Sequence, residues 1–160
     1  MSMKQDQKGH NTTPDPDTAF VVDIILKSEA HQSAITDEDH LREAVGLTRA
    51  INLSITQSIQ IHLGRPVAGT LITKGKREEV KHLCEEEAPD VVIVNHTLSP
   101  VQQRNLEKEW GTKVIDRTGL ILEIFGERAQ TREGKIQVEL AAKEYQKSRL
   151  VRSWTHLERQ

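Results

Sequence analysis

Short apolar runs that alternate with helical stretches are the feature that most constrains the fold of this chain. Residues 20–26 (FVVDIIL) and 91–94 (VVIV) are β-branched and apolar over the length of a strand, which is typical of strands covered on both faces. Residues 54–63 and 113–116 predict two further strands, and helical patterns lie between them. This alternation predicts an α/β fold, with a small, mostly parallel sheet flanked by helices.

The helices between these strands carry start and stop signals. Thr36 is a predicted N-cap, and the acidic residues 37–39 follow it where the helix dipole favours negative charge. A polar loop is expected before this helix, which should run to about Leu53. Pro89 ends the helix that precedes the 91–94 strand. The helix that follows this strand is predicted to begin at Ser99 and Pro100, with the proline in its first turn, and Gly111 is its predicted C-cap.

The last part of the chain predicts an antiparallel helical hairpin. Two apolar helical patterns flank the polar residues 127–135, and the second has the i, i+3, i+4, i+7 spacing of a helix with one packed face. The residues of that face are Val138, Ala141, Ala142 and Tyr145. The chain therefore divides into a disordered leader at 1–18, an α/β subdomain at 19–116, and a hairpin with the start of a linker at 117–160.

Charge is divided unevenly along the chain. Residues 1–126 hold 14 Lys or Arg against 19 Asp or Glu, whereas residues 127–160 hold 8 against 5. Arg128, Arg132 and Lys135 lie close together in the turn between the two predicted helices. A cationic end of this kind suits contact with an anionic partner, although a solvated helix face explains the difference about as well.

Composition argues against several classes of protein. The apolar runs are far shorter than the roughly 20 residues that span a bilayer, and the first residues lack the apolar segment of a secretory signal. A single cysteine, Cys84, cannot form an internal disulfide, so a cytoplasmic location fits best. His82 and Cys84 are two positions apart on a predicted helix and point to different faces, so no metal site is expected. We expect no membrane or DNA partner.

Polar residues at predicted strand ends form one candidate site. In an open parallel sheet the ligand crevice lies at the carboxyl ends of the strands, where Asn95, His96 and Asp116 stand. A His and an Asp could act as acid and base. Residues at strand ends more often cap helices, however, and Asp116 before Thr118 and Gly119 is typical of a helix start. No residue is assigned a catalytic role.

A second candidate is the segment Lys74, Gly75 and Lys76 before a predicted helix, where free amides and the dipole favour phosphate. The phosphate loop of nucleotide hydrolases requires a Ser or Thr after its Gly-Lys pair, and Arg77 occupies that position. Neither that loop nor the Rossmann glycine fingerprint occurs in the sequence. We therefore expect no nucleotide hydrolysis and no cofactor within this chain.

Three sequence blocks resemble the amino-terminal domain of the HflX family of ribosome-associated GTPases. They are residues 114–125 (VIDRTGLILEIF), 128–141 (RAQTREGKIQVELA) and 153–160 (SWTHLERQ). Residues 99–106 also fit, more loosely, as does the segment at 74–76. A chance similarity would not be expected to reproduce several blocks in the same order. Residues 53–72 depart from the Gly-containing pattern that is usual in the family.

The resemblance implies a sheet subdomain and a hairpin placed before a covalently attached GTPase domain, to which GTP and magnesium would belong. Family members bind the large ribosomal subunit and are linked to splitting or rescuing stalled ribosomes, with the hairpin tip near the peptidyl-transferase centre. The chain would then be an isolated domain or a truncated relative. Carried over to this sequence, the resemblance assigns the ribosomal RNA contacts to Arg128, Gln130, Thr131, Arg132, Gly134 and Lys135.

Two other functions stay open on the sequence. A small nucleotide-binding sensor or enzyme would use the strand-end crevice at Asn95, His96 and Asp116. A dimerisation or regulatory domain would pack its hairpin on a partner helix. The second alternative requires an uncovered apolar stripe on the arm, whereas an RNA-binding arm requires basic side chains that face outward.

Overall fold

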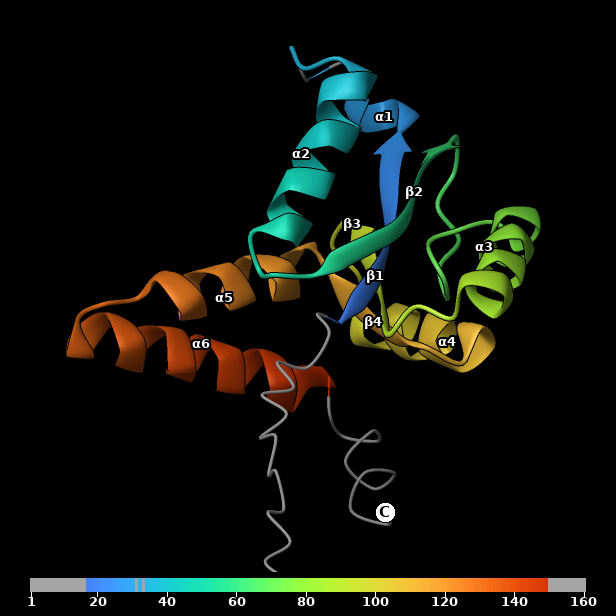
Figure 1. Cartoon of the computed structure of the whole chain (residues 1–160). Helices are drawn as coiled ribbons and strands as arrows, with labels where there is room; N and C mark the ends of the chain where they lie inside the picture. Colours follow the sequence, from blue (N-terminus) through green and yellow to red (C-terminus); the bar gives the residue numbers. More distant parts are fainter. Residues whose placement is uncertain (1–16, 31, 33, 150–160) are drawn as a thin grey trace, which may run out of the picture.

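One parallel sheet of four strands organises the described part of the chain, in the order β2-β1-β3-β4. The computed structural model describes residues 17–30, 32 and 34–149. Figure 1 shows helices on both sides of the sheet and a two-helix arm that extends away from it. The strands are β1 (Thr18–Leu26), β2 (Ser54–Leu63), β3 (Val91–Asn95) and β4 (Lys113–Asp116). This arrangement confirms the predicted α/β fold with a helical hairpin.

The described residues also form six helices. They are α1 (Lys27–Ala30), α2 (Asp37–Arg49), α3 (Lys74–Glu87), α4 (Pro100–Trp110), α5 (Arg117–Arg128) and α6 (Arg132–Arg149). The predicted leader lies outside the described residues up to residue 16, and Thr18 already belongs to β1. The expected linker lies outside them as well, because the description ends at residue 149.

Two helix predictions between β1 and β2 were wrong. The segment after β1 was expected to be a loop, but its first four residues form α1. None of them is buried, so the segment has no apolar periodicity that could have indicated a helix. Helix α2 ends at Arg49 and not near Leu53, because Asn52 adopts a left-handed conformation with φ 61°. This turn redirects the chain into β2 at Ser54.

The predicted helix caps are present. The Thr36 hydroxyl accepts a hydrogen bond from the backbone N–H of Asp39 at 3.2 Å, and Ser99 forms a reciprocal capping box with Gln102. At the end of α4, Gly111 takes the left-handed conformation with φ 62°, which glycine adopts at little cost. Local sequence therefore fixes these helix boundaries.

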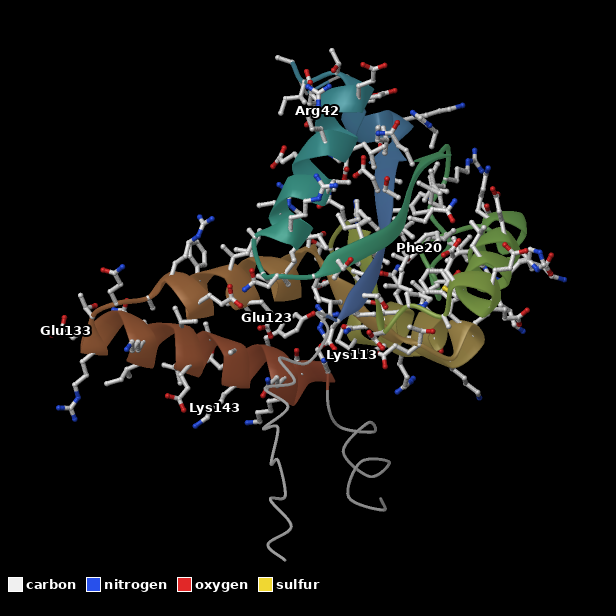
Figure 2. All side chains as sticks on the ribbon, in the orientation of Figure 1. Phe20, Arg42, Lys113, Glu123, Glu133 and Lys143 are labelled. Atoms are coloured by element: carbon white, nitrogen blue, oxygen red, sulfur yellow. The ribbon has the colours of Figure 1, made fainter. Side chains whose placement is uncertain are left out.

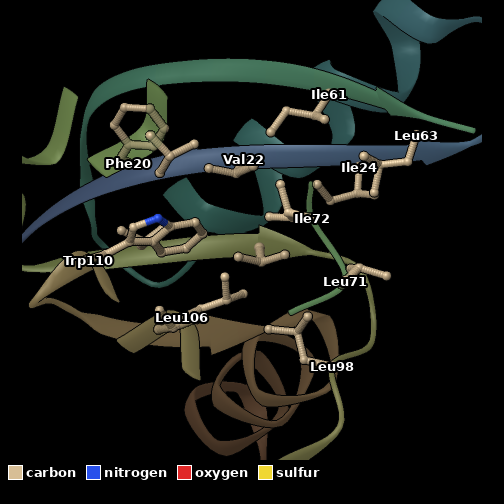
Figure 3. Close-up of a cluster of buried hydrophobic side chains, with 14 of the residues drawn as sticks. Phe20, Val22, Ile24, Ile61, Leu63, Leu71, Ile72, Leu98, Leu106 and Trp110 are labelled. Atoms are coloured by element: carbon tan, nitrogen blue, oxygen red, sulfur yellow. The ribbon is translucent and has the colours of Figure 1, made fainter. Parts of the chain in front are cut away.

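Alternate residues of β1 point into two separate apolar layers. Phe20, Val22 and Ile24 lie in the larger layer, between the sheet and helices α3 and α4, where Leu106 and Trp110 pack against them (Figure 3). Ala19 and Val21 lie in the smaller layer against α2 and α5. Each large apolar side chain buried in this way contributes roughly 1.5–3 kcal/mol. The sheet is therefore a rigid platform for the elements that leave it.

Candidate functional site

Helices α5 and α6 form an arm whose far end stands away from the sheet. The two helices are joined by residues 129–131 and run side by side in opposite directions (Figure 1). Glu133, in the first turn of α6, lies at the outer end of this arm in Figure 2, while Phe20 lies in the sheet. The arm therefore presents residues 128–135, called the tip below, at a distance from the body.

A buried carboxylate holds the root of the arm. Asp116 ends β4 and is fully buried. Its two carboxylate oxygens accept hydrogen bonds from the backbone N–H groups of Leu98 at 3.0 Å and Gly119 at 2.9 Å, and from the Tyr145 hydroxyl at 2.5 Å. The Arg149 guanidinium approaches the same carboxylate at 3.4 Å. The Asp116 side chain thus links the end of β4 to the first turn of α5 and to two residues of α6.

On the α6 side, Arg149 and Tyr145 hold the root. Arg149 also donates to the Gln103 side-chain oxygen at 2.9 Å, and its guanidinium carbon lies 4.6 Å from the centre of the Tyr145 ring, within the range of a cation–π contact. Burial, and after it the hydrogen bond to Asp116, raises the pKa of Tyr145 well above its usual range. The phenol therefore stays protonated and keeps donating to the carboxylate.

Close packing at the root depends on Gly119. A Cβ atom at this position would lie 2.9 Å from the Tyr145 hydroxyl oxygen and 3.0 Å from a methyl carbon of Ile115. Further along the same helix, a Cβ on Gly126 would meet its nearest neighbour, Val138, at 3.7 Å. The helices are therefore in tightest contact where they leave the sheet.

The middle of the arm has a shallow groove and an exposed apolar surface. The groove has a volume of about 300 Å³. Apolar and charged side chains both line it: Leu122, Glu123, Gly126, Glu127, Lys135, Val138, Glu139 and Ala142. Outside the groove, Phe125, Ile136 and Leu140 are 56%, 53% and 58% exposed.

The predicted RNA-contact residues gather at the tip. Arg128, Gln130, Thr131, Arg132 and Lys135 are exposed, and Gly134 is half-buried. No ion pair joins Arg128, Arg132 or Lys135 to another of the described residues. Their positive charges therefore face solvent without an acidic partner in this part of the chain.

Thr131 and Gly134 shape the tip. The Thr131 hydroxyl accepts a hydrogen bond from the backbone N–H of Gly134 at 3.0 Å, and the Thr131 carbonyl accepts one from Lys135 N–H at 2.9 Å. A Cβ on Gly134 would lie 2.9 Å from that hydroxyl oxygen. These two residues start α6 and keep the turn tight, which leaves Arg128, Gln130, Arg132 and Lys135 as the outward-facing groups.

The strand-end candidates do not come together in one crevice. Asp116 pairs in register with Val94, and its carboxylate lies at the root of the arm. Asn95 follows Val94 on β3 and points to the other face of the sheet, where its amide donates to Asp23 at 2.9 Å. His96 lies 3.4 Å from Glu29 of α1. The sheet thus separates Asn95 from Asp116.

Sequence reasoning missed Asp23, a fully buried carboxylate in the middle of β1. His40 lies 2.8 Å from its Oδ2, Gln60 donates to it at 2.9 Å and Asn95 donates to its other oxygen. The signal that could have found it was one acid within the apolar run 20–26. These partners hold α2 on the sheet, so we interpret the cluster as structural.

Lys74, Gly75 and Lys76 were expected to precede a helix, but they form the first turn of α3 itself. Lys74, Gly75 and Lys76 are exposed, but Arg77 turns inward and donates to Glu109 at 2.8 Å and to the Ile72 carbonyl at 2.7 Å. It anchors the preceding turn at the position where the phosphate loop of nucleotide hydrolases requires a hydroxyl. Among residues 17–30, 32 and 34–149, no group of His, Cys, Asp or Glu could hold a metal ion.

Cys84 is a core residue. It packs in the larger apolar layer, and burial, with a smaller contribution from Glu85, raises the pKa of its thiol to about 11. A thiol with this pKa is a poor nucleophile at neutral pH. His82, two residues earlier, is exposed and lies 3.1 Å from Glu86.

No helix within residues 17–30, 32 and 34–149 combines the length and the apolar character that a bilayer span requires.

Comparisons with known proteins identify the family. Residues 38–126 match the family described as GTP-binding GTPase N-terminal, and residues 128–160 match the family described as GTP-binding GTPase Middle Region. A Magnetococcus marinus protein named GTPase HflX is 54% identical over 120 residues, which cover 71% of this chain and 28% of that protein. The Escherichia coli GTPase HflX is 44% identical over 124 residues, which cover 78% and 29%.

Solved structures agree with these matches. A GTP-binding protein from the archaeon Sulfolobus solfataricus, in complex with GDP, superposes with a TM-score of 0.59 and 25% identity, covering 86% of this chain and 40% of that one. A complex of SsGBP with GDP gives a TM-score of 0.62 at 25% identity, covering 83% and 36%. The chain spans less than a third of the two HflX relatives named above. It belongs to the GTPase HflX family and matches the amino-terminal domain of that family.

Proposed function

We propose that this chain is a docking module, which inserts the cationic tip of the arm into ribosomal RNA of the large ribosomal subunit. It has no catalytic activity of its own in this proposal and works within a longer GTPase of the cytoplasm. One observation carries it: Arg128, Arg132 and Lys135 are exposed at the outer end of the arm, with no ion pair to any described residue. Unpaired Arg and Lys side chains neutralise phosphate and release its counterions.

The charge distribution favours binding through the tip. Residues 17–116 hold 11 Lys or Arg against 16 Asp or Glu, so the body repels a polyanion while the tip attracts it. The contacts of Asp116 with Tyr145 and Arg149 hold the arm in its extended position. A tip that is already extended loses little conformational entropy on binding.

In this proposal GTP and magnesium bind outside the described residues. A covalently attached GTPase domain would bind both. Its nucleotide state would then change the affinity of the whole protein for the ribosome, which is how the module would take part in splitting or rescuing stalled ribosomes.

Reversal of the three tip charges tests the proposal. The triple variant Arg128→Glu, Arg132→Glu, Lys135→Glu should weaken cosedimentation with purified large subunits by at least about tenfold, because each lost phosphate contact removes favourable counterion release. Circular dichroism should show an unchanged fold, since all three side chains are exposed.

A matched control separates the tip from net charge. Lys81, Arg104 and Lys108 are exposed on α3 and α4, and their change to Glu alters the charge by the same amount. This control should bind normally. Unchanged binding of the tip variant at physiological salt, or an equal loss in the control, would contradict the proposal.

A second candidate function is contact with a protein partner through the arm. It is favoured by the exposure of Phe125, Ile136 and Leu140, since apolar side chains clustered on a surface mark interaction sites. The variant Phe125→Ser, Ile136→Ser, Leu140→Ser in the same sedimentation assay distinguishes the two. Loss of binding in this variant, with normal binding of the tip variant, would assign docking to the apolar surface.

A nucleotide sensor in the strand-end crevice has less structural support. Asn95 and Asp116 lie on opposite faces of the sheet, and each is engaged by neighbouring side chains. Calorimetric titration of the chain with ATP and GTP should give no heat of binding. Tight binding with turnover would favour the sensor over the docking module.

A further inference from the structure

Thr131 carries an exposed hydroxyl group within the tip, in the residues 129–131 that join α5 to α6. Arg128 precedes it by three positions, and Arg132 follows it directly. Lys135 lies one helical turn later, and its N–H donates to the Thr131 carbonyl at 2.9 Å. None of these three cations has an ion pair to a described residue. The Thr131 hydroxyl is therefore flanked by positive charges without an anion in this part of the chain.

The Thr131 hydroxyl is open to a modifying enzyme. It accepts a hydrogen bond from the backbone N–H of Gly134 at 3.0 Å. A Cβ atom on Gly134 would lie 2.9 Å from the hydroxyl oxygen, so the glycine leaves uncovered a group that another residue would crowd. Residues 129–131 belong to no helix, and exposed loop tips are where enzymes that act on proteins, proteases among them, gain access.

The surrounding charges distinguish Thr131 from two other threonines that directly precede a helix. Thr36 is followed by three acidic residues. Thr73 is exposed, but the residue three positions before it is Thr70. Thr131 instead has one arginine three positions before it and another directly after it. Protein kinases select substrates partly by charge pattern, and this pattern suits a kinase whose substrate groove is acidic.

We propose that Thr131 is a phosphorylation site and that its phosphate occupies the tip cations in place of ribosomal RNA. This inference rests on the proposed docking function and adds its regulation. A protein kinase transfers the terminal phosphoryl group of ATP to Thr131. A bond forms between Oγ1 and phosphorus, the bond to the β-phosphate oxygen breaks, ADP leaves, and the hydroxyl proton passes to a base of the kinase.

A phosphate at this position matches the tip in charge. Residues 128–135 hold three Lys or Arg against one Glu, a net charge of +2, and phosphothreonine carries roughly −1.5 to −2 at neutral pH. The modification therefore cancels most of the charge that attracts RNA. Phosphate oxygens accept hydrogen bonds from guanidinium and ammonium groups, so the cations are engaged within the chain. Negative charge at the start of α6 favours the helix, so the fold is retained.

Cosedimentation of the whole chain with purified large subunits tests the inference. The chain phosphorylated at Thr131, made by encoding phosphothreonine at that codon, should bind at least about tenfold more weakly than the unmodified chain at physiological salt. Treatment with a phosphatase should restore binding. The matched control is phosphorylated at Thr73, which is exposed and directly precedes α3. Helix α3 packs on the other side of the sheet from α5 (Figure 1), so this control should bind normally.

The outcomes separate this inference from the docking function. Equal binding of the unmodified chain and the chain phosphorylated at Thr131 would overturn the inference and leave docking through the tip intact. An unmodified chain that does not bind would overturn the docking function, and the inference with it. An equal loss in the Thr73 control would show that any added phosphate weakens binding, which would refute a specific role of the tip.

A kinase assay tests access to the hydroxyl in the folded chain. A kinase that requires arginine three positions before its target should incorporate phosphate from ATP, and mass spectrometry should locate it on Thr131. Arg128→Gln should strongly reduce incorporation. Phosphate found only at other positions, or none at all, would show that the tip does not admit such an enzyme and would overturn the inference.

Phosphorus NMR tests whether the phosphate contacts the tip cations. In the chain phosphorylated at Thr131, nearby cations favour the dianion and so lower the pKa of the phosphate. Arg128→Gln combined with Lys135→Gln should therefore raise that pKa. Coincident titrations of the two phosphorylated chains would show that the phosphate does not engage these side chains, and the proposed competition with RNA would be refuted.

Discussion

The two ends of helix α6 place the same residue type in opposite environments. Arg149, at the root, is nearly buried and bonds to Asp116 and Gln103. Arg132, at the tip, is exposed and has no ion pair to the described residues. The side chains at the root bond to one another and so contribute to folding. The charges at the tip are left for a partner, which is the division of roles that a docking arm requires.

The largest expected effect is at the root. Asp116→Ala should reduce the free energy of unfolding by about 3–5 kcal/mol, because it leaves a nearly buried guanidinium and buried donors without their acceptor. Urea unfolding followed by circular dichroism measures the change. Arg132→Ala, at the other end of the arm, should change stability by no more than about 0.5 kcal/mol.

The comparison between root and tip would fail if these two variants were equally stable. It would also fail if Asp116→Ala kept the wild-type stability, since that result would mean that the root does not hold the arm.

Two glycines of α5 provide a smaller, sterically defined test. Gly119→Ala should destabilise the chain by about 1–3 kcal/mol, because its Cβ would crowd the Tyr145 hydroxyl oxygen and Ile115. Gly126→Ala meets only an ordinary contact at 3.7 Å and should stabilise the helix by about 0.5–1 kcal/mol. Thermal unfolding of both variants gives the comparison, and the same sign for both would show that packing is uniform along the arm.

Much of the fold follows from local sequence. The bounds of β2 and β4 agree with those predicted from apolar patterning, and Thr36 and Gly111 cap the helices that they were expected to cap. These signals involve neighbouring residues only. Helix α1 was not predicted, because it is a single turn with no buried side chain.

The site was less predictable where it depends on distant residues. Exposure of the tip follows from its polarity, but the meeting of Asp116 with Tyr145, 29 positions later, depends on how α6 returns to the sheet. Tyr145 was interpreted only as part of an apolar face. The separation of Asn95 from Asp116 likewise follows from strand register, because neighbouring residues of a strand point to opposite faces of the sheet. The rule that ligands bind at strand ends does not say which face a given residue takes.

The smallest effect at neutral pH, and the most direct readout of the root, is the ionisation of Tyr145. It is the single tyrosine of the sequence, so tyrosinate absorbance reports on this group alone. Burial and the bond to Asp116 raise its pKa above the ordinary value of 10.0, which approximates the unfolded chain. The stability that this bond provides is therefore present below that pH and is lost as the pH rises toward the higher folded pKa. In the folded chain, confirmed by circular dichroism at each pH, tyrosinate should appear only at pH values clearly above those for the urea-unfolded chain. Coincident titrations would show that Tyr145 is solvated and that the root is open.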